Sequence, residues 1–186
     1  GLCEPILEKY TDENFIGVTF RPATVCGFAP RLRLDLSVNI LTNHAVNNNI
    51  IKVFGGDQLR PNLHVQDYCD AIEVLMHAPG EIVNRKKYNI GYQNLSISEI
   101  ALVVKRAVEE QFPEKSIDIV RTQSDDNRSY HINSDKIKKE LNFNPKLTIK
   151  NAVVDLCEAF KNNLIINSFT NDIYFNVARL KNLKIS

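Results

Sequence analysis

Hydrophobic positions along this chain change between a period of two and a helical period, which predicts interleaved strands and helices. Alternation rich in β-branched residues predicts a buried strand from Phe15 to Arg21, and Pro22 closes it. Ile50 to Phe54 predicts a second strand, which two glycines stop. The runs "KYNIG" and "SIDIVRT" predict two more strands.

Apolar stripes with helical spacing fall between these strands. The clearest runs through "LSISEIALVVKRAVEEQF", where Ser96 and Glu99 have the spacing of a capping box. Leu36 to Asn48 also predicts a helix, and the asparagines at its end stop it. Because strands and helices interleave, the chain is predicted to be an α/β protein.

Three polar residues are expected to be helix N-caps. Asp67 precedes a helix from Tyr68 to His77, which follows a very short strand at Leu63–Val65. Ser134 and Thr148 are expected to begin two further helices. The final stretch, "NDIYFNVARLKNLKIS", has a mixed pattern and is expected to pack on the body.

Composition excludes several classes of function. The 186 residues are 44% hydrophobic and carry a formal net charge of +1, which suits one globular domain or slightly more. A charge this close to zero gives no reason to expect a nucleic-acid partner, and no apolar run has the length of a membrane helix. The four cysteines lie far apart, which indicates reduced thiols and a cytoplasmic protein.

The amino-terminal stretch "GLCEPILEKY" has no start methionine and resembles a helix already under way. It lacks the basic region and apolar core of a signal peptide. We therefore expect the chain to be part of a longer protein.

Motifs that would define an active site are missing from the sequence. It contains no GxGxxG dinucleotide fingerprint, Walker A loop, HExxH or GxSxG. The four histidines have no metal-ligand spacing, and each is expected to be a surface or packed residue. The sequence therefore predicts no catalytic residue and no metal site.

What remains is a set of arginines around the ends of predicted strands: Arg21, Arg31, Arg33, Arg60 and Arg128. Open α/β folds bind ligands at the carboxyl ends of strands, and a guanidinium suits phosphate oxygens. Several such loops could form a diphosphate clamp. The alternative is that each arginine pairs with a nearby carboxylate: Arg33 with Asp35, Arg60 with Asp57 or Asp67, and Arg128 with Asp125 or Asp126.

Three collinear segments between Phe15 and Phe160 carry a resemblance that no single one would establish. "FRPATVCGFAPRLRLD" is similar to Arg-Pro, a short spacer and Val-Tyr-Gly-Pro. "IIKVFGGDQLRPNLHVQDYCDAI" resembles a strand, glycine-rich loop, arginine, short strand and helix, and "DDNRSYHINSDKIKKELNFNPKLTIKNAV" resembles Asp-x-Arg, Ser-x-Lys and Leu-Gly-Phe-x-Pro. Together they resemble the extended short-chain dehydrogenase/reductase family. It includes NAD-dependent nucleotide-sugar epimerases and dehydratases, such as UDP-glucose 4-epimerase and dTDP-glucose 4,6-dehydratase.

The resemblance implies a nucleotide-sugar substrate and a set of residues that would bind it. Arg60 and Arg128 match arginines that bind the substrate diphosphate, and Phe54 matches a residue at the nucleobase end. Arg33 and Asn39 lie in a segment that contacts substrate in the family.

The resemblance also implies NAD as the cofactor of the parent enzyme. Pro22 to Val25 match the turn whose backbone meets the nicotinamide carboxamide. The fold implied is the carboxy-terminal part of a Rossmann-like fold plus a small α/β substrate-binding domain. Residues 1–49 would be the remnant of the dinucleotide-binding domain, and residues 50–186 the interleaved substrate-binding part.

Departures from the family pattern concern the catalytic residues. The tyrosine of Tyr-x-x-x-Lys would fall before Gly1, and Glu4 stands where the lysine is expected. A glutamate there would oppose the lowering of the tyrosine pKa. Cys26 replaces the tyrosine of Val-Tyr-Gly, and Phe28 replaces the proline after it.

Three functions stay open from the sequence. In the first, the chain is a substrate-binding portion of such an enzyme and is inactive alone. In the second, it is a non-catalytic truncated domain that binds a nucleotide sugar or a partner. In the third, it is a scaffold whose arginines only pair with carboxylates. A missing half would leave a strand edge and apolar faces exposed. We therefore expect a homo-oligomer or an amino-terminal partner.

Overall fold

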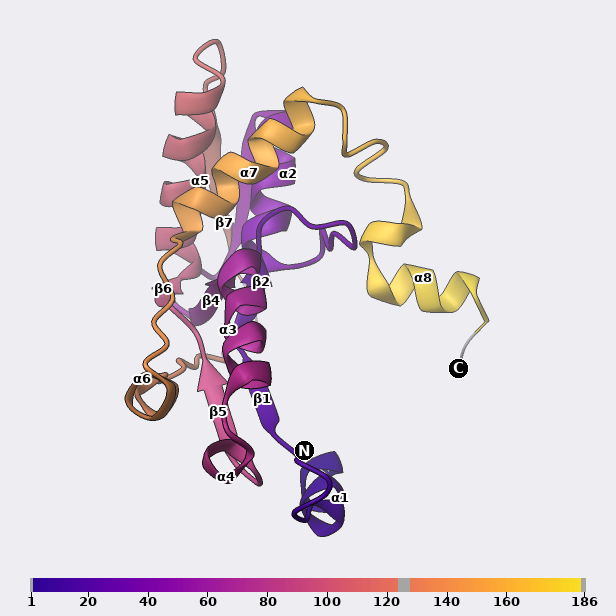
Figure 1. The fold of residues 1–186 in the computed structure, drawn as a ribbon. Coiled ribbons are helices and arrows are strands. Elements are labelled where there is room, and N and C mark those ends of the chain that lie inside the picture. The colour runs from indigo at the N-terminus through magenta and orange to yellow at the C-terminus, as the bar shows by residue number, and fades with distance from the viewer. Residues whose placement is uncertain (1, 124–127, 185–186) are drawn as a thin grey trace.

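The computed structural model describes residues 2–123 and 128–184; Asp125 and Asp126, the expected partners of Arg128, lie outside these ranges. Figure 1 shows a mixed α/β arrangement in which strands and helices alternate along the chain. The strands are β1 (Thr19–Pro22), β2 (Thr24–Cys26), β3 (Ile50–Phe54), β4 (Leu59–His64), β5 (Lys87–Ile90), β6 (Gln93–Ser96) and β7 (Asp118–Thr122).

The helices fill the segments between and after the strands. Along the two described ranges, none combines the length and the apolar character needed to cross a membrane. They are α1 (Cys3–Tyr10), α2 (Ser37–Asn48), α3 (Val65–His77), α4 (Gly80–Val83), α5 (Ile97–Gln111), α6 (Asp135–Leu141), α7 (Ile149–Lys161), the 3₁₀ helix η1 (Asp172–Tyr174) and α8 (Asn176–Asn182).

Most strand pairs are parallel, as the α/β prediction requires. β1 pairs with β5, β2 with β4 and β3 with β7, all in parallel, whereas β4 and β6 are antiparallel. Parallel neighbours need long crossover connections, and helices supply them here. The predicted α/β class is confirmed.

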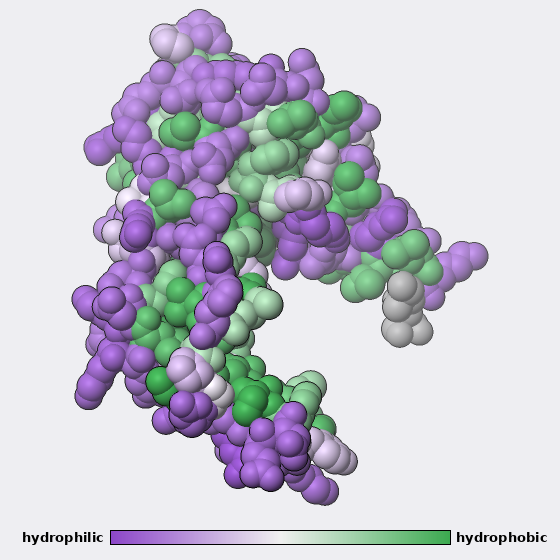
Figure 2. All heavy atoms as spheres, viewed as in Figure 1, coloured by the Kyte–Doolittle hydropathy of each residue, from purple (hydrophilic) through white to green (hydrophobic). Residues whose placement is uncertain are grey.

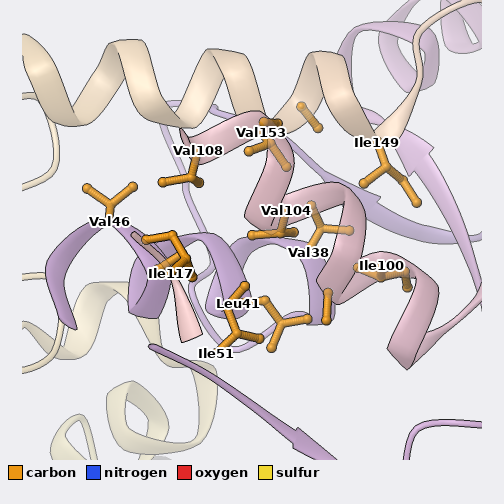
Figure 3. Close-up of a cluster of buried hydrophobic side chains, with 14 of the residues drawn as sticks. Val38, Leu41, Val46, Ile51, Ile100, Val104, Val108, Ile117, Ile149 and Val153 are labelled. Carbon is orange, nitrogen blue, oxygen red and sulfur yellow. The ribbon is translucent and has the colours of Figure 1, made fainter. Parts of the chain in front are cut away.

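The largest hydrophobic core lies where α2, α5 and α7 pack on one another and on β3 (Figure 3). The apolar stripe of α5 meets the inward faces of the other two helices, so each helix buries one side. The side chains at the centre are fully buried: Val38, Ala45, Ile51, Val53, Ile100, Val104, Val108 and Val153.

Two smaller cores complete the packing. One joins β1, β5, α3 and α6 around Tyr88 and Ile90, both fully buried. The other joins the loop after β2 to the carboxy-terminal segment through Leu34, Leu156 and Tyr174. The mixed tail therefore packs on the body as expected, although α8 reaches away from it in Figure 1.

The first predicted strand is shorter than expected. Phe15 and Ile16 are 52% and 43% exposed and lie outside β1. The Asp12 side chain accepts hydrogen bonds from the backbone N–H groups of Asn14 and Phe15, which folds this stretch into a turn. The prediction of a buried strand from Phe15 was wrong because this local turn outcompetes the alternating pattern.

The strand before α3 is longer than predicted, and this changes the place of Arg60. The expected strand at Leu63–Val65 is the end of β4, so Arg60 lies on a strand, opposite Leu95 of β6, and not in a loop. Pro61 is tolerated because pairing with β2 begins only at Asn62, one residue later.

Side-chain caps form at two of the predicted positions and not at the other two. Ser96 and Glu99 form the capping box of α5, and Thr148 forms one with Asn151 at α7. Asp67 is not the cap of α3, because the His64 ring accepts the hydrogen bond from Gln66 N–H instead. Ser134 stands directly before α6, as predicted, but makes no capping bond, since its hydroxyl bonds to the backbone of Gly91.

One side of the molecule is hollowed, and apolar residues are exposed around it (Figure 2). The helices α1 and α8 border this hollow. Exposed apolar residues near the amino-terminal end include Leu2, Ile6, Tyr10 and Phe15. Within the described residues, β1 has a strand neighbour on one edge only.

The capping box of α5 gives a stability prediction. Ser96→Ala removes the acceptor of Glu99 N–H and should lower the free energy of unfolding by about 1 kcal/mol. Urea unfolding followed by circular dichroism measures this change. Ser116→Ala, at an exposed loop serine, is the control and should change stability by less than about 0.5 kcal/mol. Equal stability of the two variants would contradict the assigned cap.

Candidate functional site

A pocket of about 400 Å³ lies between α2, β3 and the first residues of β4 and α5. Its apolar wall comes from Ile40, Leu41, Phe54 and Ile97, and the polar residues beside them are Ser37, His44, Lys52, Gln58 and Arg60. None of these described lining residues is acidic, whereas two are cationic. An apolar cavity with a positive rim suits an anionic ligand that has one flat apolar part.

Arg60 is held at this pocket by the chain around it. Its guanidinium donates to the Leu59 carbonyl at 3.0 Å and to the Arg128 carbonyl, and it lies 5.5 Å from the centre of the Tyr130 ring. A guanidinium fixed by two carbonyls and a ring needs little reordering before it meets an anion.

The segment that begins at Arg128 is docked on β4 and β6. Ser129 Oγ accepts from Leu59 N–H at 3.0 Å, and Asn94 makes two hydrogen bonds to the backbone of Ile132. These contacts bring the backbone of Arg128 beside the guanidinium of Arg60. The Arg128 side chain is exposed and does not line the pocket.

Phe54 and Lys52 line the pocket together because they are two residues apart on β3 and so share one face. The Phe54 ring is 57% exposed, which leaves it accessible to a ligand. His44 of α2 lines the same pocket. Partial burial and the charge of Lys52 lower the pKa of His44, so its ring is neutral at neutral pH.

Asn39 and Arg33 do not line the pocket. The buried Asn39 side chain accepts from Gly27 N–H at 3.0 Å and donates to the Arg33 carbonyl at 2.8 Å, so it shapes the loop after β2. Arg33 pairs with Asp35 through two hydrogen bonds, which confirms the predicted ion pair. Burial raises the pKa of Asp35, but the bonds from Arg33 and Asn176 outweigh it and hold the pKa below its usual range.

Pro22 and Val25 lie on two strands and not in the expected turn. Pro22 is the last residue of β1, and Val25 sits opposite Leu63 in the parallel pair of β2 and β4. Between them, Ala23 N–H donates to the Ile90 carbonyl at 2.7 Å. This backbone is therefore engaged in strand pairing.

Glu4, which the resemblance aligns with a lysine, forms an ion pair with Arg21 of β1. The Arg21 Nε–Glu4 Oε1 distance is 2.8 Å. The hydrogen bond from Arg21 lowers the pKa of Glu4 to about 2. The carboxylate is thus ionised and committed to a cation from its own chain.

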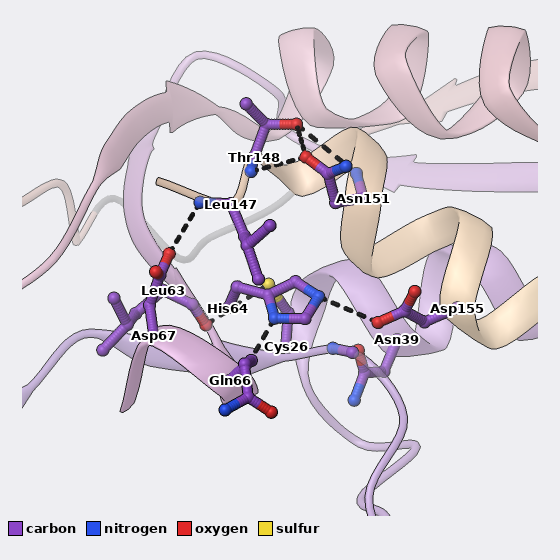
Figure 4. Close-up of polar contacts among 11 residues, drawn as sticks. Cys26, Asn39, Leu63, His64, Gln66, Asp67, Leu147, Thr148, Asn151 and Asp155 are labelled. Atoms are coloured by element: carbon purple, nitrogen blue, oxygen red, sulfur yellow. Dashed lines mark hydrogen bonds and ion pairs between the residues drawn. The ribbon is translucent and has the colours of Figure 1, made fainter. Parts of the chain in front are cut away.

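A second polar cluster surrounds His64 at the other end of β4 (Figure 4). Since Gln66 N–H donates to Nδ1, the ring proton is on Nε2, which donates to Asp155 at 3.0 Å. Asp67 accepts from the backbone N–H groups of Lys146 and Leu147. This network connects α3 with α7 and with the residues that directly precede α7.

Cys26 lies beside His64 in Figure 4. With Asp155, these residues have the composition of a catalytic triad, but the thiol is not activated as a nucleophile. Burial, with smaller contributions from Asp155 and Asp67, raises the pKa of Cys26 to about 12, and its thiol donates to the Leu63 carbonyl. A thiol that stays protonated is no nucleophile at neutral pH. Among residues 2–123 and 128–184, no three metal-ligating side chains gather.

The sequence prediction placed Arg60 and Phe54 at a site, and the structure brings these two residues together. It missed Ser37, His44, Lys52, Gln58 and Ile97. Lys52 had a detectable signal, since alternation along β3 puts it on the face of Phe54. The α2 and α5 residues had none, because only the packing of those helices carries them to the pocket.

The chain belongs to the GDP-mannose 4,6 dehydratase family, whose model matches residues 31–156. This match covers more than half of the chain. It confirms the resemblance to nucleotide-sugar dehydratases and epimerases of the extended short-chain dehydrogenase/reductase type.

Solved structures share the fold. The chain is similar to dTDP-glucose 4,6-dehydratase from Bacillus anthracis in complex with NAD (23% identity, TM-score 0.67), with 87% of this chain and 49% of that chain covered. It is also similar to UDP-glucose 4-epimerase from Thermotoga maritima with UDP-glucose (22% identity, TM-score 0.69; 87% and 51% covered). A third similar structure is UDP-N-acetylglucosamine 4-epimerase from Bacillus cereus (18% identity, TM-score 0.69), with 86% of this chain and 53% of that chain covered. The chain spans about half the length of these proteins.

The buried carboxylate of Asp67 gives a second stability prediction. Asp67→Asn replaces a carboxylate that accepts backbone N–H bonds by an amide with one oxygen. It should lower the free energy of unfolding by about 2 kcal/mol. Asp70→Asn makes the same change on the same helix, at a carboxylate that accepts from the Gln66 side chain and not from Lys146 or Leu147, and is the matched control. Urea unfolding of both variants is the measurement, and a cost at Asp67 no larger than at Asp70 would contradict the role given to the network.

Proposed function

We propose that this chain is the substrate-binding portion of an NAD-dependent nucleotide-sugar epimerase or dehydratase, and that its pocket binds the nucleotide diphosphate. The observation that carries this proposal is the pre-oriented guanidinium of Arg60 at a cavity with two cationic and no acidic described lining residues. The family match supports the choice of a nucleotide sugar over other anions.

Two kinds of contact bind the nucleotide in this pocket. Arg60 donates to the diphosphate oxygens in a geometry that its planar fork favours. The ring of Phe54 and the side chains of Ile40 and Leu41 offer an apolar surface, and a base stacks on the ring. A volume of about 400 Å³ is within the range that holds one small ligand.

Other expected binding residues take different parts in this proposal. Arg128 supplies charge near the phosphates, and its carbonyl orients Arg60. Asn39 and Arg33 shape the loop after β2 and do not contact the nucleotide through the pocket.

The residues present do not fit a whole NAD molecule. The sequence has no glycine-rich dinucleotide fingerprint, and the Pro22–Val25 backbone, which matches the carboxamide contact, takes part in strand pairing. Glu4, bound to Arg21, cannot serve as the lysine that lowers a tyrosine pKa. We propose that NAD acts in the parent enzyme and is not held by this chain alone.

The polypeptide 1–186 should therefore show no turnover. Incubation with NAD and UDP-, dTDP- or GDP-linked glucose or mannose, followed by chromatography of the sugar nucleotides, should return the starting compounds. Any NAD-dependent conversion would contradict the proposed absence of catalysis by this chain.

Nucleotide binding is the direct test of the pocket. One of UDP, dTDP, GDP, CDP and ADP should raise the melting temperature and titrate in calorimetry, and Arg60→Ala should weaken binding by about tenfold to a hundredfold because it removes charge-assisted hydrogen bonds. Arg106→Ala, at an exposed position of α5, changes the net charge equally and should leave binding unchanged. Equal binding by both variants would refute the role of Arg60.

An interaction module is the second candidate function, and one observation favours it. Leu2, Ile6, Tyr10 and Phe15 expose apolar surface on or near α1, which contacts β1 through the Glu4–Arg21 ion pair, and β1 has one strand neighbour in the described chain. Such a surface suits a second copy or an amino-terminal partner. Absence of binding by all five nucleotides, with concentration-dependent association in sedimentation velocity, would favour this role over the first.

A further inference from the structure

The segment that follows α7, residues 162–184, is called here the C-terminal arm. It lies outside the range that the family model matches, residues 31–156. Ile165 and Tyr174 anchor it in the third hydrophobic core, where both are largely buried. In Figure 1 the arm lies next to the loop that leads from β2 to α2.

The arm touches the wall of the pocket through one aromatic contact. The Phe169 ring packs against the His44 ring with centroids 5.0 Å apart and a tilt of 54°. His44 lines the pocket, and its Nδ1 lies 3.2 Å from Asn48 Nδ2. An amide nitrogen only donates, so Nδ1 accepts, and the ring is held by Asn48 at one edge and by Phe169 on another side.

The arm also binds the loop that precedes α2. Arg31 donates to the Ile173 carbonyl at 2.6 Å and to Asn176 Oδ1 at 2.9 Å, and Leu34 N–H donates to the Tyr174 carbonyl at 2.9 Å. Because α2 begins directly after this loop, the arm braces α2 at both its start and its middle. α2 carries four of the pocket's lining residues: Ser37, Ile40, Leu41 and His44.

We propose that the C-terminal arm is a positioning element of the pocket, and that Phe169 holds the His44 ring in the orientation that a bound nucleotide meets. The inference rests on the proposed nucleotide-diphosphate site. His44 forms the contact with the ligand, and Phe169 acts through His44. The arm thereby adds to the site a residue from outside the part of the chain that carries the family match.

Calorimetric titration with the five nucleoside diphosphates tests this arrangement in a double-mutant cycle. Phe169→Ala and His44→Ala should each weaken binding of the preferred nucleotide about two- to tenfold, the range expected for loss of one aromatic contact. In the His44→Ala background, Phe169→Ala should add less than twofold, since its effect passes through the missing ring. Phe169→Leu, which keeps apolar packing, should recover part of the affinity.

Two further measurements separate positioning from folding. The imidazole C–H proton resonances of His44 should shift on nucleotide binding in the wild type, and their free positions should move in Phe169→Ala, which loses the ring current. Val177→Ala, on α8 with 66% exposure, is the control on the same arm and should bind like the wild type. Phe169 is itself 42% exposed, so its replacement leaves the core intact.

The outcomes distinguish the two proposals. If the wild type binds none of the nucleotides, the proposed function fails and this inference falls with it. If the wild type binds but Phe169→Ala binds equally well, or if the two substitutions add fully, nucleotide binding stands and the positioning role of Phe169 is refuted.

Discussion

Strand β4 is the constraint on which the other parts depend. It pairs in parallel with β2 and antiparallel with β6, so its backbone is fixed from both sides. Arg60 stands near its start, at the pocket, and His64 stands at its end, where the ring caps α3 and binds Asp155 of α7. A shift of β4 by one residue would turn both side chains to the opposite face.

The charge of the pocket comes from the side chains that line it. Arg33 and Arg21 form ion pairs with Asp35 and Glu4 away from the pocket. Arg60 is oriented at the pocket by the Leu59 and Arg128 carbonyls and by the Tyr130 ring. Among the described lining residues two are cationic and none is acidic. Lys52, on β3, is the second cationic residue of the lining.

The His64 cluster shows how similar residues serve stability instead of chemistry. A histidine between a thiol and a carboxylate has the composition of a nucleophilic site, yet each member is committed to a backbone or side-chain partner. Burial keeps the Cys26 thiol protonated, and Asp67 binds the backbone that leads into α7. The network therefore holds two helices against the sheet.

The sequence by itself determined the α/β class, β3, β5, β7, the capped helices α5 and α7, and the family, because these depend on local periodicity, capping chemistry and motif order. Tertiary structure decided the rest. It extended β4 through Arg60, since pairing with β6 lies beyond any local signal, and it moved the cap of α3 from Asp67 to His64. Only packing brought His44, Lys52 and Ile97 from separate elements to the pocket with Arg60, and only packing laid Phe169 against His44. Residues so far apart in sequence meet because their helices and strands are buried against one another.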